Sequence, residues 1–253
     1  LENRLVQLKV RFPEDIRDAV LQATMQGKLT RQMEEDGTGD ELYLQIQAEK
    51  QRLIGEGKIK QQKPLGEITQ DEIPFDIPEN WKWVRLGELG EMVGGGTPKT
   101  HVNEYWNGGT IPWITPADMN HEDKYISEGK KSITQVGLNN SSAQLFPAGS
   151  VIISSRAPIG YIMIAKRESA TSQGCKTFSA YNKDLIISEF VYYLMRLRTS
   201  DLILRASGTT FKEISGSGIG ETVIPLPPVS EQHRIVARLN DLLPLCETIR
   251  DEM

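Results

Sequence analysis

A proline-rich segment that leads into an amphipathic helix constrains the fold of this chain more than any other feature. Residues 224–236 read Ile-Pro-Leu-Pro-Pro-Val-Ser-Glu-Gln-His-Arg-Ile-Val, and the prolines exclude helix and favour an extended backbone. Ser230 is predicted to cap the helix that follows, because its side chain can accept hydrogen bonds from unpaired N–H groups of the first turn. Glu231 then lies where the helix dipole favours a carboxylate. The segment is therefore predicted to be the exit of a folded domain into a helix.

The predicted C-terminal helix carries an apolar seam. Its apolar residues recur at alternating spacings of four and three, which places them on one helix face. The seam consists of Ile235, Leu239, Leu242, Cys246 and Ile249. Two interpretations fit this spacing: a partner helix covers the seam, or the helix lies on its own domain.

A second apolar seam with the same spacing is predicted at the N-terminus. It consists of Leu1, Leu5, Leu8 and Phe12. Pro13 is expected to kink or break this helix, and Gly27 is expected to end the helical segment that resumes after it.

A further helix is predicted from Asp40, as its N-cap, to Gly55. Leu42, Ile46 and Leu53 recur on one of its faces, which is therefore the face expected to be buried. Residues 56–80 follow, and their prolines, glycines and charged residues favour an extended linker along a surface.

The composition changes after residue 80, where short β-prone runs separated by Gly and Pro turns begin. These runs are residues 83–86, 90–93, 111–114, 150–154 and 161–165. One internal helix is predicted to start near Ser188 and to bury Phe190, Tyr193, Leu194 and Leu197. The pattern predicts an α+β fold, in which a mixed sheet and helix domain is flanked by helices. The expected divisions are residues 1–55, helical; 56–80, linker; 81–227, the globular domain; and 228–253, the C-terminal helix.

Charge and composition exclude some classes of function. The net charge is −5, but residues 81–230 carry 15 basic and 13 acidic side chains, so the acidity lies in the flanks and does not oppose nucleic-acid binding by the middle. No apolar run of about 18 residues predicts a membrane span, and the chain is expected to be cytoplasmic. Cys175 and Cys246 lie far apart and only three histidines occur, so neither a metal site nor a disulfide is expected and both cysteines are interpreted as packing residues.

Motifs typical of enzymes are absent from the sequence. The Gly94-Gly95-Gly96-Thr97-Pro98-Lys99 stretch fits neither the GxxxxGK[ST] nor the GxGxxG pattern, and no GxSxG or HExxH motif occurs. No cofactor site is predicted. The glycine-rich stretch is interpreted either as a tight turn after a strand or as a loop whose backbone closely approaches a polyanion.

Three other loops are rich in hydrogen-bond donors, which suits contact with phosphates. They are residues 154–160, 171–176 and 207–212. Arg156, in the first, can pair with a guanine edge or a phosphate, or with a carboxylate of the protein itself.

The sequence also resembles a known family, the specificity subunits of type I restriction-modification enzymes. The resemblance rests on Pro78-Glu79-Asn80-Trp81-Lys82-Trp83, Gly96-Thr97-Pro98, Ile111-Pro112-Trp113, Phe146-Pro147-Ala148-Gly149-Ser150, Ile159-Gly160, residues 209–214 and the proline-rich segment before Glu231-Gln232. It implies a target-recognition domain that reads a DNA half-site, mounted on helices that pair antiparallel as a spacer. It implies no catalysis, since methylation would come from modification subunits and cleavage from a restriction subunit.

This chain has one such recognition domain with helix on both sides, where the family usually has two. The resemblance therefore leaves two arrangements open: a half-length subunit that forms a homodimer, or a part of a longer subunit. A structural adaptor without DNA binding of its own is the alternative function. The candidate DNA-binding residues are Thr97, Lys99, Ser155, Arg156, Gln173, Thr209, Thr210 and Lys212.

Overall fold

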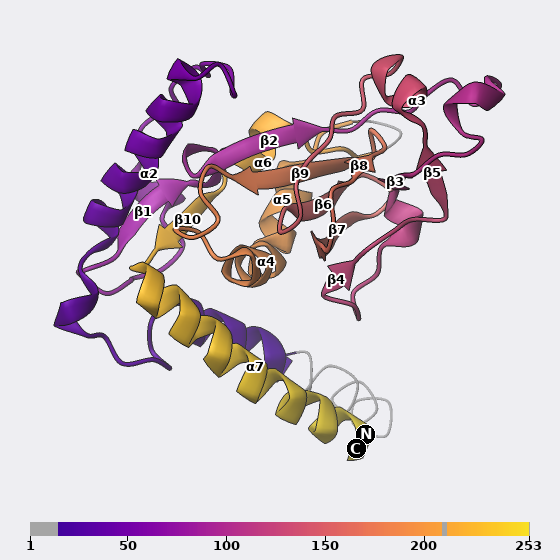
Figure 1. Ribbon diagram of the computed structural model, residues 1–253. Coiled ribbons are helices and arrows are strands. Elements are labelled where there is room, and N and C mark those ends of the chain that lie inside the picture. Colours follow the sequence, from indigo (N-terminus) through magenta and orange to yellow (C-terminus); the bar gives the residue numbers. More distant parts are fainter. Residues whose placement is uncertain (1–14, 209–211, 253) are drawn as a thin grey trace.

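The computed structural model describes residues 15–208 and 212–252, without the side chains of residues 247 and 249–252. A five-stranded sheet occupies the centre of the molecule, and helices lie beside and beneath it (Figure 1). This mixture of sheet and helix confirms the predicted α+β class.

The main sheet has the strand order β2-β9-β6-β7-β4. In that order the strands are Gly90–Gly94, Cys175–Ala180, Val151–Ser155, Ile159–Ala165 and Tyr125–Ile126. The first four pair antiparallel with their neighbours, and β4 pairs parallel with β7. The edge strand β4 thus comes from the long segment that separates β2 from β6.

Strand β6 is buried along its whole length because both faces of the sheet are covered. Val151 and Ile153 face the larger apolar cluster, which includes Phe190 and Leu194, whereas Ile152 belongs to a second cluster with Phe146. This alternation is the period of two that a strand imposes on its side chains. It explains why Val151, Ile152 and Ile153 are consecutive apolar residues rather than alternating with polar ones.

Two smaller sheets complete the β structure. A three-stranded sheet has the order β5-β3-β8, and a two-stranded sheet joins β1 to β10. Their strands are Lys131–Ile133, Ile111–Ile114, Ala170–Thr171, Lys82–Arg85 and Val223–Leu226. All five runs predicted as strands are therefore strands, with ends that differ by up to two residues. No strand was predicted at β4, β5, β8 or β10. The prediction was also wrong for β9, because its first residues were interpreted as the end of a polar loop and the rest was not predicted as a strand.

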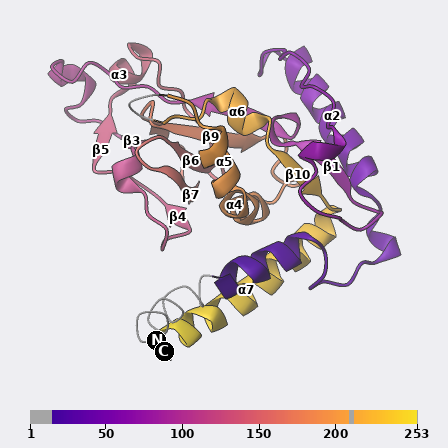
Figure 2. The same ribbon diagram turned by 180° about the vertical axis from the view of Figure 1, so that it is seen from behind.

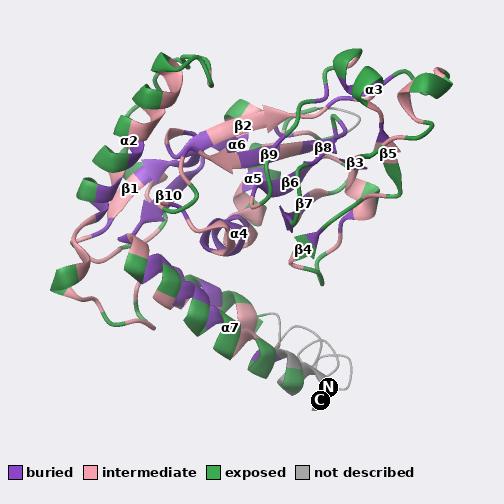
Figure 3. Ribbon diagram, viewed as in Figure 1, coloured by how far each residue is buried: buried purple, intermediate pink, exposed green. Residues whose placement is uncertain are grey.

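The predicted internal helix is α4, Ser188–Leu197, whose Phe190, Tyr193 and Leu194 are buried as expected (Figure 3). It packs on β6 and β7. Three short helices were not predicted: α3, Gln135–Asn139; α5, Thr199–Arg205; and α6, Gly216–Gly220.

Helix α2 spans Gly39–Gly55, so its predicted end at Gly55 is confirmed. The prediction that Asp40 caps it was wrong. Thr38 is the N-cap: its side chain accepts a hydrogen bond from the Glu41 N–H at 3.2 Å, while the Glu41 carboxylate accepts from the Thr38 N–H at 2.9 Å. Asp40 instead pairs with Lys82 at 2.5 Å, which ties the first turn of α2 to β1.

The proline-rich segment contains strand β10, in which Pro225 lies opposite Trp83 of β1. Helix α7, Val229–Glu252, begins directly after Pro228, whose carbonyl accepts a hydrogen bond from the Gln232 N–H at 3.0 Å. Ser230 consequently lies inside the first turn, and its predicted role as the N-cap was wrong. The prolines exclude helix up to residue 228, as expected, but the helix starts at Val229, two residues earlier than an N-cap at Ser230 predicted.

The apolar seam of α7 is buried at Ile235, Leu239 and Cys246 and half-buried at Leu242, while the side chain of Ile249 lies outside the described part. Residues 15–25 are helical and run antiparallel alongside α7 (Figures 1 and 2). Their Leu21 and Met25 share the apolar cluster of the seam. Gly27, with φ of +69°, follows this helix, as predicted.

Helix α7 also contacts the globular body, so both interpretations of its seam hold in part. The Asn240 side-chain oxygen accepts hydrogen bonds from the Tyr193 hydroxyl at 2.7 Å and from Lys124 Nζ at 2.8 Å. The predicted N-terminal seam of Leu1, Leu5, Leu8 and Phe12, and the predicted kink at Pro13, lie outside the described residues.

A fully buried carboxylate joins the start of α7 to the N-terminal segment. Glu231 accepts hydrogen bonds from the Thr30 hydroxyl at 2.5 Å, from Gln32 Nε2 at 2.8 Å and from Arg234 Nε at 2.7 Å. Arg234 also pairs with Asp36. Glu231 therefore does more than complement the helix dipole, because it links segments that are about 200 residues apart.

Its neighbour Gln232, also fully buried, joins α7 to the segment before α4. The Gln232 Oε1 atom accepts from the Ile187 N–H at 3.0 Å, and its Nε2 donates to the carbonyls of Leu185 at 3.2 Å and Pro227 at 3.3 Å. The consecutive pair Glu231-Gln232 thus fixes the direction in which α7 leaves the body.

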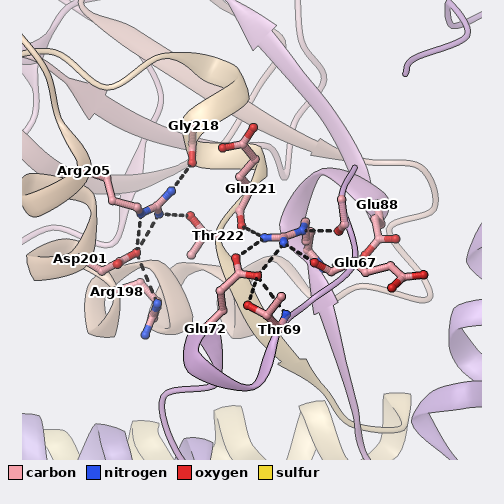
Figure 4. Close-up of polar contacts among 12 residues, drawn as sticks. Glu67, Thr69, Glu72, Glu88, Arg198, Asp201, Arg205, Gly218, Glu221 and Thr222 are labelled. Carbon is pink, nitrogen blue, oxygen red and sulfur yellow. Dashed lines mark hydrogen bonds and ion pairs between the residues drawn. The ribbon is translucent and has the colours of Figure 1, made fainter. Parts of the chain in front are cut away.

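One arginine of β1 attaches residues 66–72 of the predicted linker to the globular body. The Arg85 guanidinium donates to the carbonyls of Gly66, Glu67 and Glu221 and makes a bidentate pair with Glu72, at 2.8–3.0 Å (Figure 4). Arg85 is 7% exposed, and these contacts engage all three of its guanidinium nitrogens. A predominantly non-helical linker is thereby attached at a defined point.

Replacing Arg85 with alanine is expected to release the linker, because three carbonyls and one carboxylate lose their donor. The free energy of unfolding should fall by about 1–3 kcal/mol, and limited proteolysis within residues 60–75 should accelerate. The matched control is Arg52→Ala, which removes an exposed arginine from ion pairs on α2 and should lower the free energy of unfolding much less than Arg85→Ala, because solvent screens exposed ion pairs. Equal effects of the two substitutions would contradict the assigned role of Arg85.

The same contact has a defined pH dependence. Hydrogen bonds from Arg85 lower the pKa of Glu72 from 4.5 to about 2. Because the folded-state pKa lies below the unfolded value, the stabilisation is complete above pH 4.5 and is lost as the pH falls toward 2. The difference in urea midpoint between the wild type and Glu72→Gln should therefore narrow over this range, and a constant difference would argue against the pair.

Candidate nucleic-acid interface

Four donor-rich loops meet at one end of the main sheet. The antiparallel register places the last residue of β2, Gly94, opposite Lys176, and Ser154 of β6 opposite Cys175. The segments that follow β2, follow β6 and precede β9 are therefore neighbours. The segment before α6 joins them through β-bridges that Glu213 makes with Arg156 and Ser207.

Backbone hydrogen bonds hold these loops together. The Gly96 N–H donates to the Thr171 carbonyl at 2.8 Å, and the Ser155 N–H donates to the Gly174 carbonyl at 2.8 Å. The Ile214 N–H donates to the Ser155 carbonyl at 3.0 Å. These main-chain contacts help to set the positions of the loop backbones.

The glycine-rich stretch owes two of its glycines to packing inside the protein. A Cβ atom at Gly95 would lie 1.9 Å from the Ser172 carbonyl oxygen, and one at Gly96 would lie 2.2 Å from the Ala143 nitrogen. The close backbone approach that was considered for a polyanion is therefore an approach to neighbouring protein loops. Thr97, which follows, is half-exposed.

Thr97 and Gln173 are brought together although 76 residues separate them. The Thr97 hydroxyl donates to the Gln173 side-chain oxygen, and this leaves the Gln173 amide N–H groups free to donate elsewhere. Gln173 is exposed, and so its amide faces solvent at the end of the sheet.

Arg156, Lys176 and Glu213 form an ion cluster beside this pair. Arg156 Nη1 lies 3.5 Å and Lys176 Nζ lies 3.3 Å from oxygens of the Glu213 carboxylate. Lys176 Nζ also donates to the Gln173 carbonyl at 2.9 Å. The carboxylate partner that the sequence left open for Arg156 is thus present, yet the Arg156 side chain remains 37% exposed.

Sequence reasoning did not select Lys176 and Glu213 as site residues. Lys176 is the last residue of one predicted loop and Glu213 directly follows another, but their pairing depends on the register of β9 with β6 and on the bridge from Arg156 to Glu213. Predicting Cys175–Ala180 as a strand would have placed Lys176 at the end of the sheet.

The other predicted residues have different environments. Ser155 is fully buried, so its hydroxyl does not reach the loop surface. Lys99 and Lys212 are exposed, and neither ammonium group has a hydrogen bond or ion pair within the described ranges. Thr209 and Thr210 lie outside the described residues.

Both cysteines are buried and unpaired, which confirms their interpretation as packing residues. Burial raises the pKa of the Cys175 thiol to about 12, and the Sγ atom lies 3.8 Å from the Met119 sulfur. Across residues 15–208 and 212–252, His, Cys, Asp and Glu side chains form no group of three that would hold a metal ion. None of the helices in these ranges has the length and apolar character that a membrane crossing requires.

Comparison with known proteins identifies the family. Residues 78–252 match the model of the type I restriction modification DNA specificity domain. The chain belongs to this family. The resemblance noted in the sequence is thereby confirmed, and the matched range contains β1, the loop cluster and α7.

Specificity subunits are the curated relatives of the chain. It is 42% identical over 167 residues to the type I restriction enzyme MjaIX specificity subunit of Methanocaldococcus jannaschii. This match covers 65% of this chain and 38% of that protein. It is 27% identical over 244 residues to the EcoAI specificity subunit of Escherichia coli, covering 93% and 40%. The chain thus spans less than half the length of these relatives.

Solved structures share the fold. The HsdS subunit from Thermoanaerobacter tengcongensis matches with a TM-score of 0.54 at 20% identity, over 99% of this chain and 52% of that chain. A chain from a structure that addresses assembly and conformational transition of the type I R-M system matches with a TM-score of 0.57 at 24% identity, over 83% and 48%. Matches of this identity establish the fold alone.

Proposed function

We propose that this specificity domain reads one half-site of duplex DNA for a type I restriction-modification system. In this proposal the chain is non-catalytic, and modification and restriction subunits that bind to it supply methylation and cleavage. Membership in the specificity-domain family supports assigning the chain to a type I restriction-modification system. Four loops that are far apart in the sequence meet at one end of the sheet, and this observation supports placing the DNA-reading surface there.

The proposed contact residues offer the donors that DNA recognition uses. Arg156 can donate two hydrogen bonds to a guanine edge, and the Gln173 amide can pair with an adenine edge. Lys99, Lys176 and Lys212 are suited to phosphate contacts, which position a protein on the duplex without reading sequence. Thr97 supports Gln173 through its hydroxyl. Thr209 and Thr210 stay predicted donors, whereas buried Ser155 is not retained.

The helices are proposed to act as a spacer. Residues 15–25 and α7 lie antiparallel, and we infer that the predicted seam of Leu1, Leu5, Leu8 and Phe12 extends this pairing along α7 as a coiled coil. The proposed divisions are a helical region of residues 1–55, a linker of 56–80, a recognition domain of 81–227 and a C-terminal helix from 228. A second recognition domain, from a second copy or from a longer chain, would then lie at a fixed distance.

Substitutions at the cluster test the DNA-reading surface. Arg156→Ala is expected to weaken binding of the target duplex by about 1–3 kcal/mol, and Lys176→Ala is expected to weaken binding of all duplexes and to reduce the slope of log K against log salt by about one. The measurement is a salt-dependent gel shift of the chain together with its modification subunit.

Matched controls lie at the opposite sheet end, where Arg167 follows β7 and Lys183 follows β9. Arg167→Ala and Lys183→Ala should leave binding within about twofold of the wild type, because surface charges beyond a Debye length contribute little. If the cluster variants bind DNA as tightly as these controls, the adaptor interpretation replaces the proposal.

Helix length tests the spacer. Inserting one turn into both helices adds about 5.4 Å, which corresponds to roughly one to two base pairs at about 3.4 Å per base pair. The gap between half-sites should change by this amount while the half-site bases stay the same, as read by methylation mapping. Altered half-site bases with an unchanged gap would contradict a spacer role.

A further inference from the structure

A carboxylate lies at the centre of the proposed DNA-reading surface, where a polyanion would be expected to meet only donors. Glu213 is 37% exposed in its side chain, and its two oxygens face different cations, Lys176 from one and Arg156 from the other. A carboxylate in this position repels phosphate. Its presence therefore needs a reason beyond non-specific attraction to DNA.

The backbone fixes the position of this carboxylate. The Glu213 N–H donates to the Ser207 carbonyl at 2.9 Å, and the Glu213 carbonyl accepts from the Ser207 N–H at 3.1 Å. The next residue, Ile214, is buried and donates to the Ser155 carbonyl at 3.0 Å. Glu213 is thus anchored on both sides, and its carboxylate is held beside the guanidinium without depending on the ion pairs alone.

Charge and hydrogen-bonding capacity define what this group can recognise. The two cations and one carboxylate leave a single net positive charge, so the cluster attracts phosphate less than the two cations would alone. In the major groove a carboxylate accepts from an exocyclic amino group, whereas the oxygens of guanine and thymine repel it. Beside an arginine that donates to guanine, Glu213 supplies the complementary acceptor.

We propose that Glu213 is a specificity-determining residue of this surface. It accepts a hydrogen bond from the exocyclic amino group of one base, cytosine N4 or adenine N6, and it offsets one cation so that phosphate contacts alone bind weakly. This inference rests on the proposed DNA-reading function and deepens it, since it assigns base discrimination to a group that lowers general affinity.

Selection from a randomised duplex pool tests the inference with this chain and its modification subunit. At one position of the duplex the wild type should enrich a base that bears an exocyclic amino group. Glu213→Ala should no longer select a base at that position, while it still selects bases at the other positions. For unrelated duplex, Glu213→Ala should bind roughly tenfold more tightly in 0.1 M salt, because one further phosphate contact becomes available. The ratio of target to unrelated affinity should fall by about tenfold or more.

Two further variants keep the test decisive. Glu213→Asp retains the charge but shortens the side chain, so it should keep the weak binding of unrelated duplex and lose selection at the same position. Glu168→Ala removes an exposed carboxylate beyond the far end of β7 and should change neither quantity. Thermal melting of each variant shows whether it folds.

Unchanged base selection in folded Glu213→Ala and Glu213→Asp would overturn the inference. A parallel loss of target and unrelated affinity in Glu213→Ala would also overturn it, because that result is expected of a residue that only positions Arg156. Failure of the proposed function looks different: Arg156→Ala and Lys176→Ala would then leave binding unchanged. Loss of binding in those variants with intact discrimination in the Glu213 variants would leave the function standing and reject this role.

Discussion

The buried carboxylate of Glu231 is the contact on which the arrangement of the molecule depends. A charged group without solvent must be fully paired, and Glu231 finds its donors in the N-terminal segment at Thr30 and Gln32 and in its own helix at Arg234. Removing one partner of such a group typically costs about 3–5 kcal/mol. The helix therefore leaves the body in one direction only while the N-terminal segment is in place. The N-terminal segment at Thr30 and Gln32 and the start of α7 thus fix each other's position.

The same region shows why the direction matters for the rest of the chain. Gln32, which donates to Glu231, accepts a hydrogen bond from the Trp81 indole N–H at 2.8 Å. Trp81 immediately precedes β1, the strand that pairs with β10 and carries Arg85. Helix, linker and strand pair are thus connected through a short series of buried polar contacts. These contacts connect the long C-terminal helix to the globular body.

Sequence reasoning located the elements that have a strong local pattern. Strand β6 begins with the apolar run Val151-Ile152-Ile153, and α4 has the helical period, so both were predicted with at most small errors at their ends. Helix starts were misplaced at Asp40 and Ser230. Thr38, two residues before Asp40, forms the capping box with Glu41, and α7 begins directly after Pro228 although Ser230 is a preferred capping residue. Strand β9 escaped because Cys-Lys-Thr-Phe-Ser-Ala has little alternation, and its place between β2 and β6 comes from pairing rather than propensity.

The candidate site was predictable at the level of loops and not at the level of contacts. Small polar and basic residues marked the loops around Thr97, Arg156 and Gln173, which the sheet register then brought together. Whether a given side chain faces solvent depends on that register, and so the burial of Ser155 and the ion pair of Arg156 with Glu213 had no signal in the sequence. Strand pairing between residues far apart in the sequence determines both the burial of Ser155 and the ion pair of Arg156 with Glu213.

The main-chain hydrogen bonds that tie the loops together have a consequence for how such a domain changes. Because Gly96, Ser155 and Ile214 hold the loops through N–H groups, exposed side chains nearby can be exchanged without moving the backbone that presents them. In the proposed function, drift of the exposed residues would then alter the preferred DNA sequence while the fold and α7 persist. A lineage carrying this architecture would acquire new targets by a few substitutions, with no need to invent a new scaffold.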